Sequence, residues 1–169
     1  MDHDALIRKL GAAIVSDFPL IHHNAFNKRD LSLVGETSLG TPVHLNRALL
    51  EGDFIIGVGS ISLSIEAGYG GGAKIVIPGE AGAKTVYKTH RRVADHPNQL
   101  GRIEGDPIRR EIEESLSHGC AGANFLPGHH RDPARNSDQD RADSFLHARI
   151  GDGGSGPPPR PRARVAVFP

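Results

Sequence analysis

Apolar residues recur three or four positions apart in several parts of the chain, which is the spacing of one face of an α-helix. The segment 4–15 is predicted on this basis to form an amphipathic helix. The segments 44–51 and 83–93 are predicted to be helical as well. A further helix is predicted after Asp106, because aspartate is a favoured N-cap and the following proline suits the first helical turn.

This last helix is predicted to have one apolar face and one charged face. Ile108, Ile112 and Leu116 form its expected buried stripe. Arg109 and Glu113 stand four residues apart and are predicted to form an ion pair on the solvent-facing side. These charged residues are therefore expected at the surface rather than in a catalytic site.

Short continuous apolar runs indicate strands. They occur at residues 31–34, 54–58 and 75–77, and residues 123–126 are predicted to add an edge to the sheet. Strand, helix and strand follow one another from residue 31 to residue 58, which is typical of a crossover unit in a parallel sheet. The predicted fold is therefore α/β, with a Rossmann-like parallel sheet flanked by helices.

A glycine-rich loop with the sequence AGYGGGAK, residues 67–74, follows the predicted central strand. Ligands bind beyond the carboxyl ends of strands in open α/β sheets, so the loop stands where a site is expected. A Walker loop would need glycine before the lysine and Ser or Thr after it, but Ala73 and Ile75 flank Lys74. The dinucleotide-binding fingerprint is matched only in part. From the glycines alone, an ordinary turn and a ligand-binding loop remain alternatives.

Composition narrows the class of protein. The 169 residues carry a formal net charge of zero, which disfavours nonspecific binding to nucleic acid or membranes. The single cysteine, Cys120, excludes an internal disulfide and suits a reducing compartment. The chain has no apolar run of membrane-spanning length, and Asp2 and Asp4 stand where a signal peptide carries positive charge. A cytoplasmic location is therefore expected.

Adjacent histidines, His22 and His23, invite comparison with a metal site. Neighbouring residues in an extended segment point to opposite faces, so the two imidazoles cannot chelate one ion together. We expect them to be polar residues at the end of an extended piece.

Three stretches together resemble the N-terminal domain of the nickel-pincer lactate racemase family. They are GETSLGTPVHLNR at 35–47, AGYGGGAKIVIPGEAG at 67–82 with T-V-x-x-x-H ending at His90, and NQLGRIEGDPIRREIEE at 98–114. The resemblance covers residues 1–126. It implies a partial lactate racemase-like α/β domain that is truncated at both ends relative to the family.

The resemblance also implies a cofactor. In this family a pyridinium-derived nickel-pincer nucleotide is tethered to a lysine, and a histidine completes the planar coordination of the nickel. By position, Lys74 resembles the tethering lysine, Gly70, Gly71 and Gly72 the cofactor-binding loop, and His90 the nickel ligand. A lysine amine can form a thioamide, and a neutral imidazole suits nickel. Enzymes that build the cofactor are expected partners, and the cofactor is expected to be absent without them.

The implied reaction is racemisation or epimerisation of a small 2-hydroxy acid by hydride transfer, with histidines moving the hydroxyl proton. Ser64 stands at the position of one of these catalytic histidines, and a serine hydroxyl does not act as a base without help. We therefore expect this chain alone to be weak or inactive. The alternatives are a noncatalytic anion- or nucleotide-binding α/β module and a nonfunctional gene remnant.

The composition changes at Pro127. Residues 127–169 contain seven prolines, seven arginines and no lysine, and they show no hydrophobic periodicity. This tail is predicted to be disordered. One hypothesis is that it results from out-of-frame translation, and the other is a genuine basic, proline-rich tail that binds a partner or nucleic acid.

Overall fold

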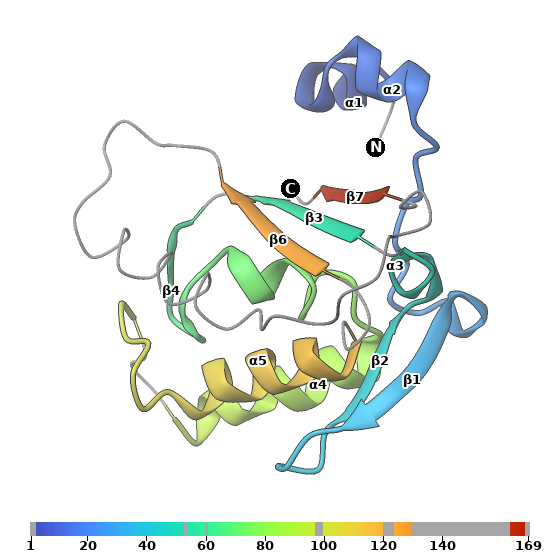
Figure 1. Cartoon of the computed structure of the whole chain (residues 1–169). Helices are drawn as coiled ribbons and strands as arrows, with labels where there is room; N and C mark the ends of the chain where they lie inside the picture. The colour runs from blue at the N-terminus through green and yellow to red at the C-terminus, as the bar shows by residue number, and fades with distance from the viewer. Residues whose placement is uncertain are drawn as a thin grey trace, which may run out of the picture.

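The structure is a computed structural model that describes residues 3–52, 54–59, 61–96, 100–119, 124–129 and 163–167 (Figure 1). The α-helices are α1 (His3–Leu10), α2 (Ala12–Asp17), α3 (Arg47–Leu50), α4 (Ala83–Arg91) and α5 (Pro107–Gly119). Short 3-10 helices are η1 (Lys28–Asp30), η2 (Gly72–Ile75) and η3 (Arg92–Ala94). The strands are β1 (Leu31–Glu36), β2 (Pro42–Asn46), β3 (Phe54–Gly59), β4 (Leu63–Ser64), β5 (Gly68–Tyr69), β6 (Asn124–His129) and β7 (Ala163–Val167).

The predicted α/β class with a parallel sheet is confirmed. Strand β3 is central, and β6 and β7 both run parallel to it in the order β6-β3-β7. Phe54 stands opposite Asn124 on one side and Ala163 on the other. Helices α4 and α5 lie together on one side of this sheet, with the turn around η2 between them and the strands (Figure 1). Strand β6 forms an edge of the sheet, as predicted for residues 123–126.

The predicted crossover unit between residues 31 and 58 is wrong. Strands β1 and β2 form an antiparallel hairpin in a separate sheet, with Leu31 opposite Asn46. Most of the segment predicted as helix 44–51 is divided between β2 and the four-residue α3. Val43 and Leu45 are both fully buried, so the segment follows the two-residue period of a strand. The helix begins only after Asn46, whose side chain accepts a hydrogen bond from the Ala48 amide at 3.0 Å.

The predicted strand at residues 75–77 is also wrong. Ile75 ends η2, and Val76 and Ile77 continue into turns up to Glu80. All three apolar side chains are buried. Because the segment is enclosed on all sides, it has no polar face to reveal its period, and an apolar run of this kind fits a strand or a packed turn equally well.

Two of the predicted helices match α4 and α5 closely, and the segment 4–15 is divided into two. The Asp106 carboxylate accepts a hydrogen bond from the Ile108 amide at 2.9 Å, which confirms the predicted cap of α5. The segment 4–15 forms α1 and α2 because Gly11 interrupts it with a φ of 88°. This left-handed conformation is incompatible with a continuous right-handed helix.

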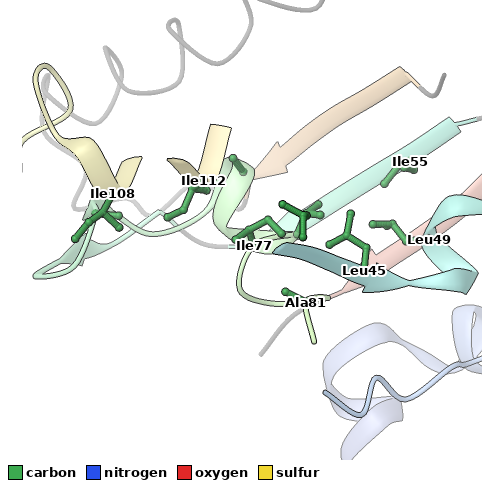
Figure 2. Close-up of a cluster of buried hydrophobic side chains, with 11 residues drawn as sticks. Leu45, Leu49, Ile55, Ile77, Ala81, Ile108 and Ile112 are labelled. Atoms are coloured by element: carbon green, nitrogen blue, oxygen red, sulfur yellow. The ribbon is translucent and has the colours of Figure 1, made fainter. Parts of the chain in front are cut away.

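The core joins the hairpin, the η2 turn and α5 to the central strand (Figure 2). Its members are apolar residues from these elements and the segments between them: Val43, Leu45, Leu49, Ile55, Ala67, Ala73, Val76, Ile77, Ala81, Ile108 and Ile112. Ala67 and Ala73 flank the glycine loop and are fully buried. Burial of both flanks holds the loop against the core at each end.

Arg109 is not on a solvent-facing surface, as the helix pattern had predicted, but is only 2% exposed. Its Nη1 donates to the Tyr69 carbonyl at 3.2 Å, and its Nε lies 3.5 Å from Glu113 Oε1. The i,i+4 spacing correctly identified the ion pair, but it could not show that the strand after Ala67 packs over this part of α5. Burial lowers the pKa of Arg109, against the opposing effect of Glu113 and Asp106.

Part of the segment 127–169 forms strands. Residues 127–129 belong to β6 and Ala163–Val167 forms β7, so at these residues the structure differs from the predicted disorder. Both strands pair with β3, whose two edges offer backbone hydrogen-bonding groups. The rest of this segment lies outside the described residues, as does Cys120.

Candidate functional site

Four side chains converge beside the glycine loop. Ser64 ends β4, Glu66 lies in the turn between β4 and β5, Lys74 lies in η2, and His90 lies in the last turn of α4. Ser64 pairs with Gly68 across the short β4–β5 hairpin. The hairpin, η2 and α4 thus bring together residues that are up to 26 positions apart in the sequence.

A single carboxylate oxygen joins the two residues that sequence analysis singled out. Glu66 Oε2 accepts a hydrogen bond from Lys74 Nζ at 2.9 Å and lies 3.2 Å from His90 Nε2. The amine of Lys74 and the imidazole of His90 therefore both contact the same carboxylate oxygen. The side chain of Lys74 is 14% exposed, whereas those of Glu66 and His90 are about one-third exposed. The cluster lies at the surface end of a largely buried lysine.

His90 is held by its other ring nitrogen. Nδ1 lies 2.9 Å from the Val86 carbonyl, one helical turn earlier, and because a carbonyl can only accept, Nδ1 carries a proton. Nε2 is the nitrogen that faces Glu66 and Lys74. A backbone acceptor on one nitrogen, which orients the other toward a ligand, is the arrangement found around metal-binding histidines.

Glu66 is ionised at neutral pH in this cluster. Partial burial acts to raise its pKa, but the hydrogen bond and charge of Lys74, followed by those of His90, outweigh burial and bring the pKa below its ordinary value. The negative charge of Glu66 is thus matched to the positive charge of the amine beside it.

Ser64 acts as an acceptor. Its Oγ receives a hydrogen bond from Lys74 Nζ at 3.0 Å and longer ones, at 3.4 Å, from the amides of Glu66 and Ala67. A serine and a lysine at this distance can form a nucleophile–base pair only when the amine is neutral, but Lys74 Nζ donates to Glu66 Oε2 as well as to Ser64 Oγ. Here Ser64 positions the lysine.

The glycine loop is shaped by close backbone packing at Gly68. Its φ is 73°, and a Cβ there would lie 1.7 Å from the Arg102 carbonyl oxygen. No residue with a side chain fits this position without movement of the backbone. The glycines predicted to contact a cofactor follow after Tyr69: Gly70 and Gly71 precede η2, and Gly72 begins it. The loop is therefore fixed by close backbone packing at Gly68, and Ala73 separates its glycines from Lys74.

Sequence analysis identified Ser64, Lys74 and His90, and the structure brings these three together. It did not identify Glu66, whose carboxylate contacts Lys74 and His90. Glu66 lies in the turn after the two-residue strand β4, so the alternation of faces along a strand gave no cue to it. The separation of 24 positions between Glu66 and His90 gives no such cue.

His23, Asn46 and Glu80 form a second polar cluster. His23 Nδ1 is 3.5 Å from Glu80 Oε2 and 3.1 Å from Asn46 Nδ2, and His23 Nε2 is 3.0 Å from the Ala81 carbonyl. His22 is exposed, so the adjacent histidines do face different surroundings. Burial raises the pKa of Glu80 to about 7, against a smaller lowering effect of the hydrogen bond with Asn46. This cluster connects the segment before β1 to the turn after η2.

We expect Glu80→Gln to stabilise the protein at pH 8 by about 2 kcal/mol and to change little at pH 5. The folded-state pKa of about 7 lies above the ordinary 4.5, so ionisation of the buried carboxyl progressively destabilises the folded state between these values. Urea unfolding at both pH values measures the difference. Glu104→Gln, at an exposed turn, is the control; an equal gain at both pH values would contradict the burial argument.

Within the described part of the chain, no group of three or more His, Cys, Asp or Glu side chains is placed to hold a metal ion. A metal at His90 would therefore need ligands that the described protein side chains do not supply.

The described residues contain no helix whose length and apolar character would let it cross a bilayer.

Comparisons with known proteins agree on one family. Residues 1–101 match the lactate racemase N-terminal domain. Lactate racemase from Thermoanaerobacterium thermosaccharolyticum is 26% identical over 106 residues, which cover 62% of this chain and 25% of that protein. Lactate racemase from Lactiplantibacillus plantarum is 31% identical over 88 residues, covering 52% and 21%. The chain thus matches a quarter or less of the length of these curated relatives.

Solved structures support the fold. The lactate racemase apoprotein from T. thermosaccharolyticum superposes with a TM-score of 0.66 at 22% identity, covering 73% of this chain and 30% of that one. A Thermotoga maritima protein gives the same TM-score and identity and covers 80% and 37%. Both similarities concern the architecture of the α/β domain.

Proposed function

Because the chain belongs to the lactate racemase N-terminal domain family, we propose that it is the cofactor-anchoring part of a nickel-pincer 2-hydroxyacid racemase or epimerase. The observation that supports this proposal is the single carboxylate oxygen of Glu66 in contact with both Lys74 Nζ and His90 Nε2. An amine that could be attached covalently and an imidazole that could bind a metal therefore contact the same carboxylate oxygen. The small 2-hydroxy acid substrate and the cofactor-building enzymes are partners under the same proposal.

The residues present fit such a cofactor in their chemistry. Lys74 offers a primary amine at the end of a largely buried side chain, and Gly70 and Gly71 before η2 are only partly buried. His90 directs Nε2 into the site because the Val86 carbonyl occupies Nδ1. One protein imidazole is too few for a stable nickel site, and the organic group would supply the remaining ligands and the hydride-accepting ring.

The protein side chains would contribute binding and orientation. Lys74 would hold the organic group covalently, and His90 would fix the metal relative to α4. Ser64 Oγ accepts hydrogen bonds from Lys74 Nζ and two amides, and a serine hydroxyl is not a base near neutral pH without help. Proton transfer at the substrate hydroxyl would therefore need a base other than Ser64, and we propose that the chain alone is weak or inactive.

The alternative of an anion- or nucleotide-binding module is less well supported. Lys74, the cation of the glycine loop, is already neutralised by Glu66 at 2.9 Å. An entering phosphate would have to displace this carboxylate or accept its repulsion. The ligand that we propose is instead one whose covalent attachment converts the amine into an uncharged thioamide.

Co-expression of the chain with cofactor-building enzymes tests the proposal. We expect the intact mass to increase by that of the cofactor and the purified protein to contain nickel, with neither change in cells that lack those enzymes. Intact-mass spectrometry and elemental analysis measure the two quantities. A folded chain that gains no mass but binds phosphate or nucleotide saturably would favour the binding module instead.

A further inference from the structure

Arg109 brings a charged group from α5 to the start of the glycine loop. Its side chain is 2% exposed, and its Nη1 donates a hydrogen bond to the Tyr69 carbonyl at 3.2 Å. A guanidinium stays protonated in proteins, so this hydrogen bond is charge-assisted and stronger than one between neutral groups. Tyr69 directly precedes Gly70, so the contact holds the loop where its run of three glycines begins.

The burial of this charge is costly for the fold alone. Within the described part of the chain, the Arg109 Nε has no hydrogen-bond partner, and Glu113, whose Oε1 lies 3.5 Å away, is itself 37% exposed. An ion pair of this kind repays little of the desolvation of a buried charge, and an apolar side chain of similar volume often stabilises a core equally well. Apolar packing therefore gives no reason for a charged residue at this position, whereas the contact with Tyr69 does.

The backbone between Tyr69 and Lys74 is short and internally bonded. Lys74 is five residues after Tyr69. The Gly70 amide donates to the Ser62 carbonyl at 2.7 Å, and the Lys74 amide donates to the Gly71 carbonyl at 3.0 Å. A displacement of the Tyr69 carbonyl would therefore be passed along this stretch to the backbone of the lysine.

Helix α5 also supports η2, the turn that contains the lysine. Ile112 of α5 and Ile77, which follows η2 closely, belong to one apolar cluster (Figure 2). Ala73 in η2 is a fully buried member of the same cluster. The same helix thus holds η2 by apolar contacts and the start of the loop by the polar contact between Arg109 and Tyr69.

We propose that Arg109 is a positioning residue for Lys74: by holding the Tyr69 carbonyl against α5, it fixes the glycine loop and with it the lysine to which the cofactor is attached. This inference rests on the proposed function for the role of Lys74. It does not rest on that function for the geometry, because the contact between Arg109 and Tyr69 belongs to the chain itself.

Amide hydrogen exchange of the purified 169-residue chain, resolved by NMR, tests this role. Arg109→Met keeps a long side chain and removes the donor, and an apolar replacement of this kind is expected to fold. We expect the amides of Gly70 and Lys74 to exchange about tenfold faster in this variant at pH 7, because the loop opens locally. The amides of α4 are the internal reference and should change by less than about twofold.

Arg110→Met is the matched control, because Arg110 is the next residue of α5 and is exposed. It should leave the exchange of both loop amides near the wild-type rate. Arg109→Lys keeps one charged donor and should exchange at the loop more slowly than Arg109→Met. Arg109→Leu provides the same test if Arg109→Met does not fold. Unchanged loop exchange, an equal rise in α4, or no rescue by lysine would overturn the proposal.

Co-expression with cofactor-building enzymes separates this outcome from that of the proposed function. We expect Arg109→Met to gain cofactor mass about tenfold more slowly than wild type, because a misplaced amine reacts more slowly. Equal rates of mass gain would reject the positioning role and keep the cofactor assignment. Faster loop exchange in Arg109→Met together with no mass gain in wild type would support the hold of Arg109 on the loop and reject the cofactor assignment.

Discussion

A Lys74→Arg chain gains no cofactor mass under co-expression conditions in which the wild-type chain does. Arginine keeps the positive charge that pairs with Glu66, so the fold around the loop should persist, but its guanidinium does not form the thioamide. The expected loss is complete, because a covalent tether is either present or absent. Intact-mass spectrometry of the two proteins, purified in parallel, measures it.

Lys88→Arg is the matched control, since Lys88 is a helical lysine outside the site. It should gain the same mass as wild type. If Lys74→Arg still gained mass, the attachment point would be elsewhere and the reading of the glycine loop as an anchor would be wrong.

His90→Ala should separate covalent attachment from metal binding. We expect this variant to gain the same mass as wild type but to contain at least tenfold less nickel.

Gly68→Ala should destabilise the protein by about 4 kcal/mol or more, a value at the upper end for single substitutions. Two effects combine at this position. The φ of 73° is unfavourable for alanine, and the new Cβ would lie 1.7 Å from the Arg102 carbonyl oxygen. Because the obstacle is backbone, either the glycine loop or the segment around Arg102 must move.

The control for Gly68→Ala is Gly105→Ala. Gly105 has a similar φ of 76°, but a Cβ there meets nothing within 4 Å. Its substitution should cost about 1 kcal/mol, the conformational cost alone. Urea unfolding of both variants measures the difference, which is attributable to the close backbone approach. Equal losses in the two variants would show that the loop accommodates a side chain at position 68.

Local sequence patterns predicted the structure correctly where the interactions that determine it lie within a few residues. The cap at Asp106 and the buried stripe of Ile108 and Ile112 depend on neighbours within one or two helical turns, and both are present. The same patterns failed at residues 44–51 and 75–77, where burial on several sides leaves no clear period to read. The predicted exposure of Arg109 was wrong for a related reason, because the segment that covers it lies about 40 residues earlier in the sequence.

The sequence by itself determined the family and indicated the two chemically distinctive residues, Lys74 and His90, because each rests on residue types at fixed spacings. The parallel α/β class was also predicted, although the crossover unit from which it was inferred is an antiparallel hairpin. Only the tertiary structure decided what lies between Lys74 and His90. The β4–β5 hairpin turns Glu66 onto both side chains, so one carboxylate oxygen contacts the amine and the imidazole together. Such a contact arises when three separate elements pack on a common core, and no periodicity along the chain records it.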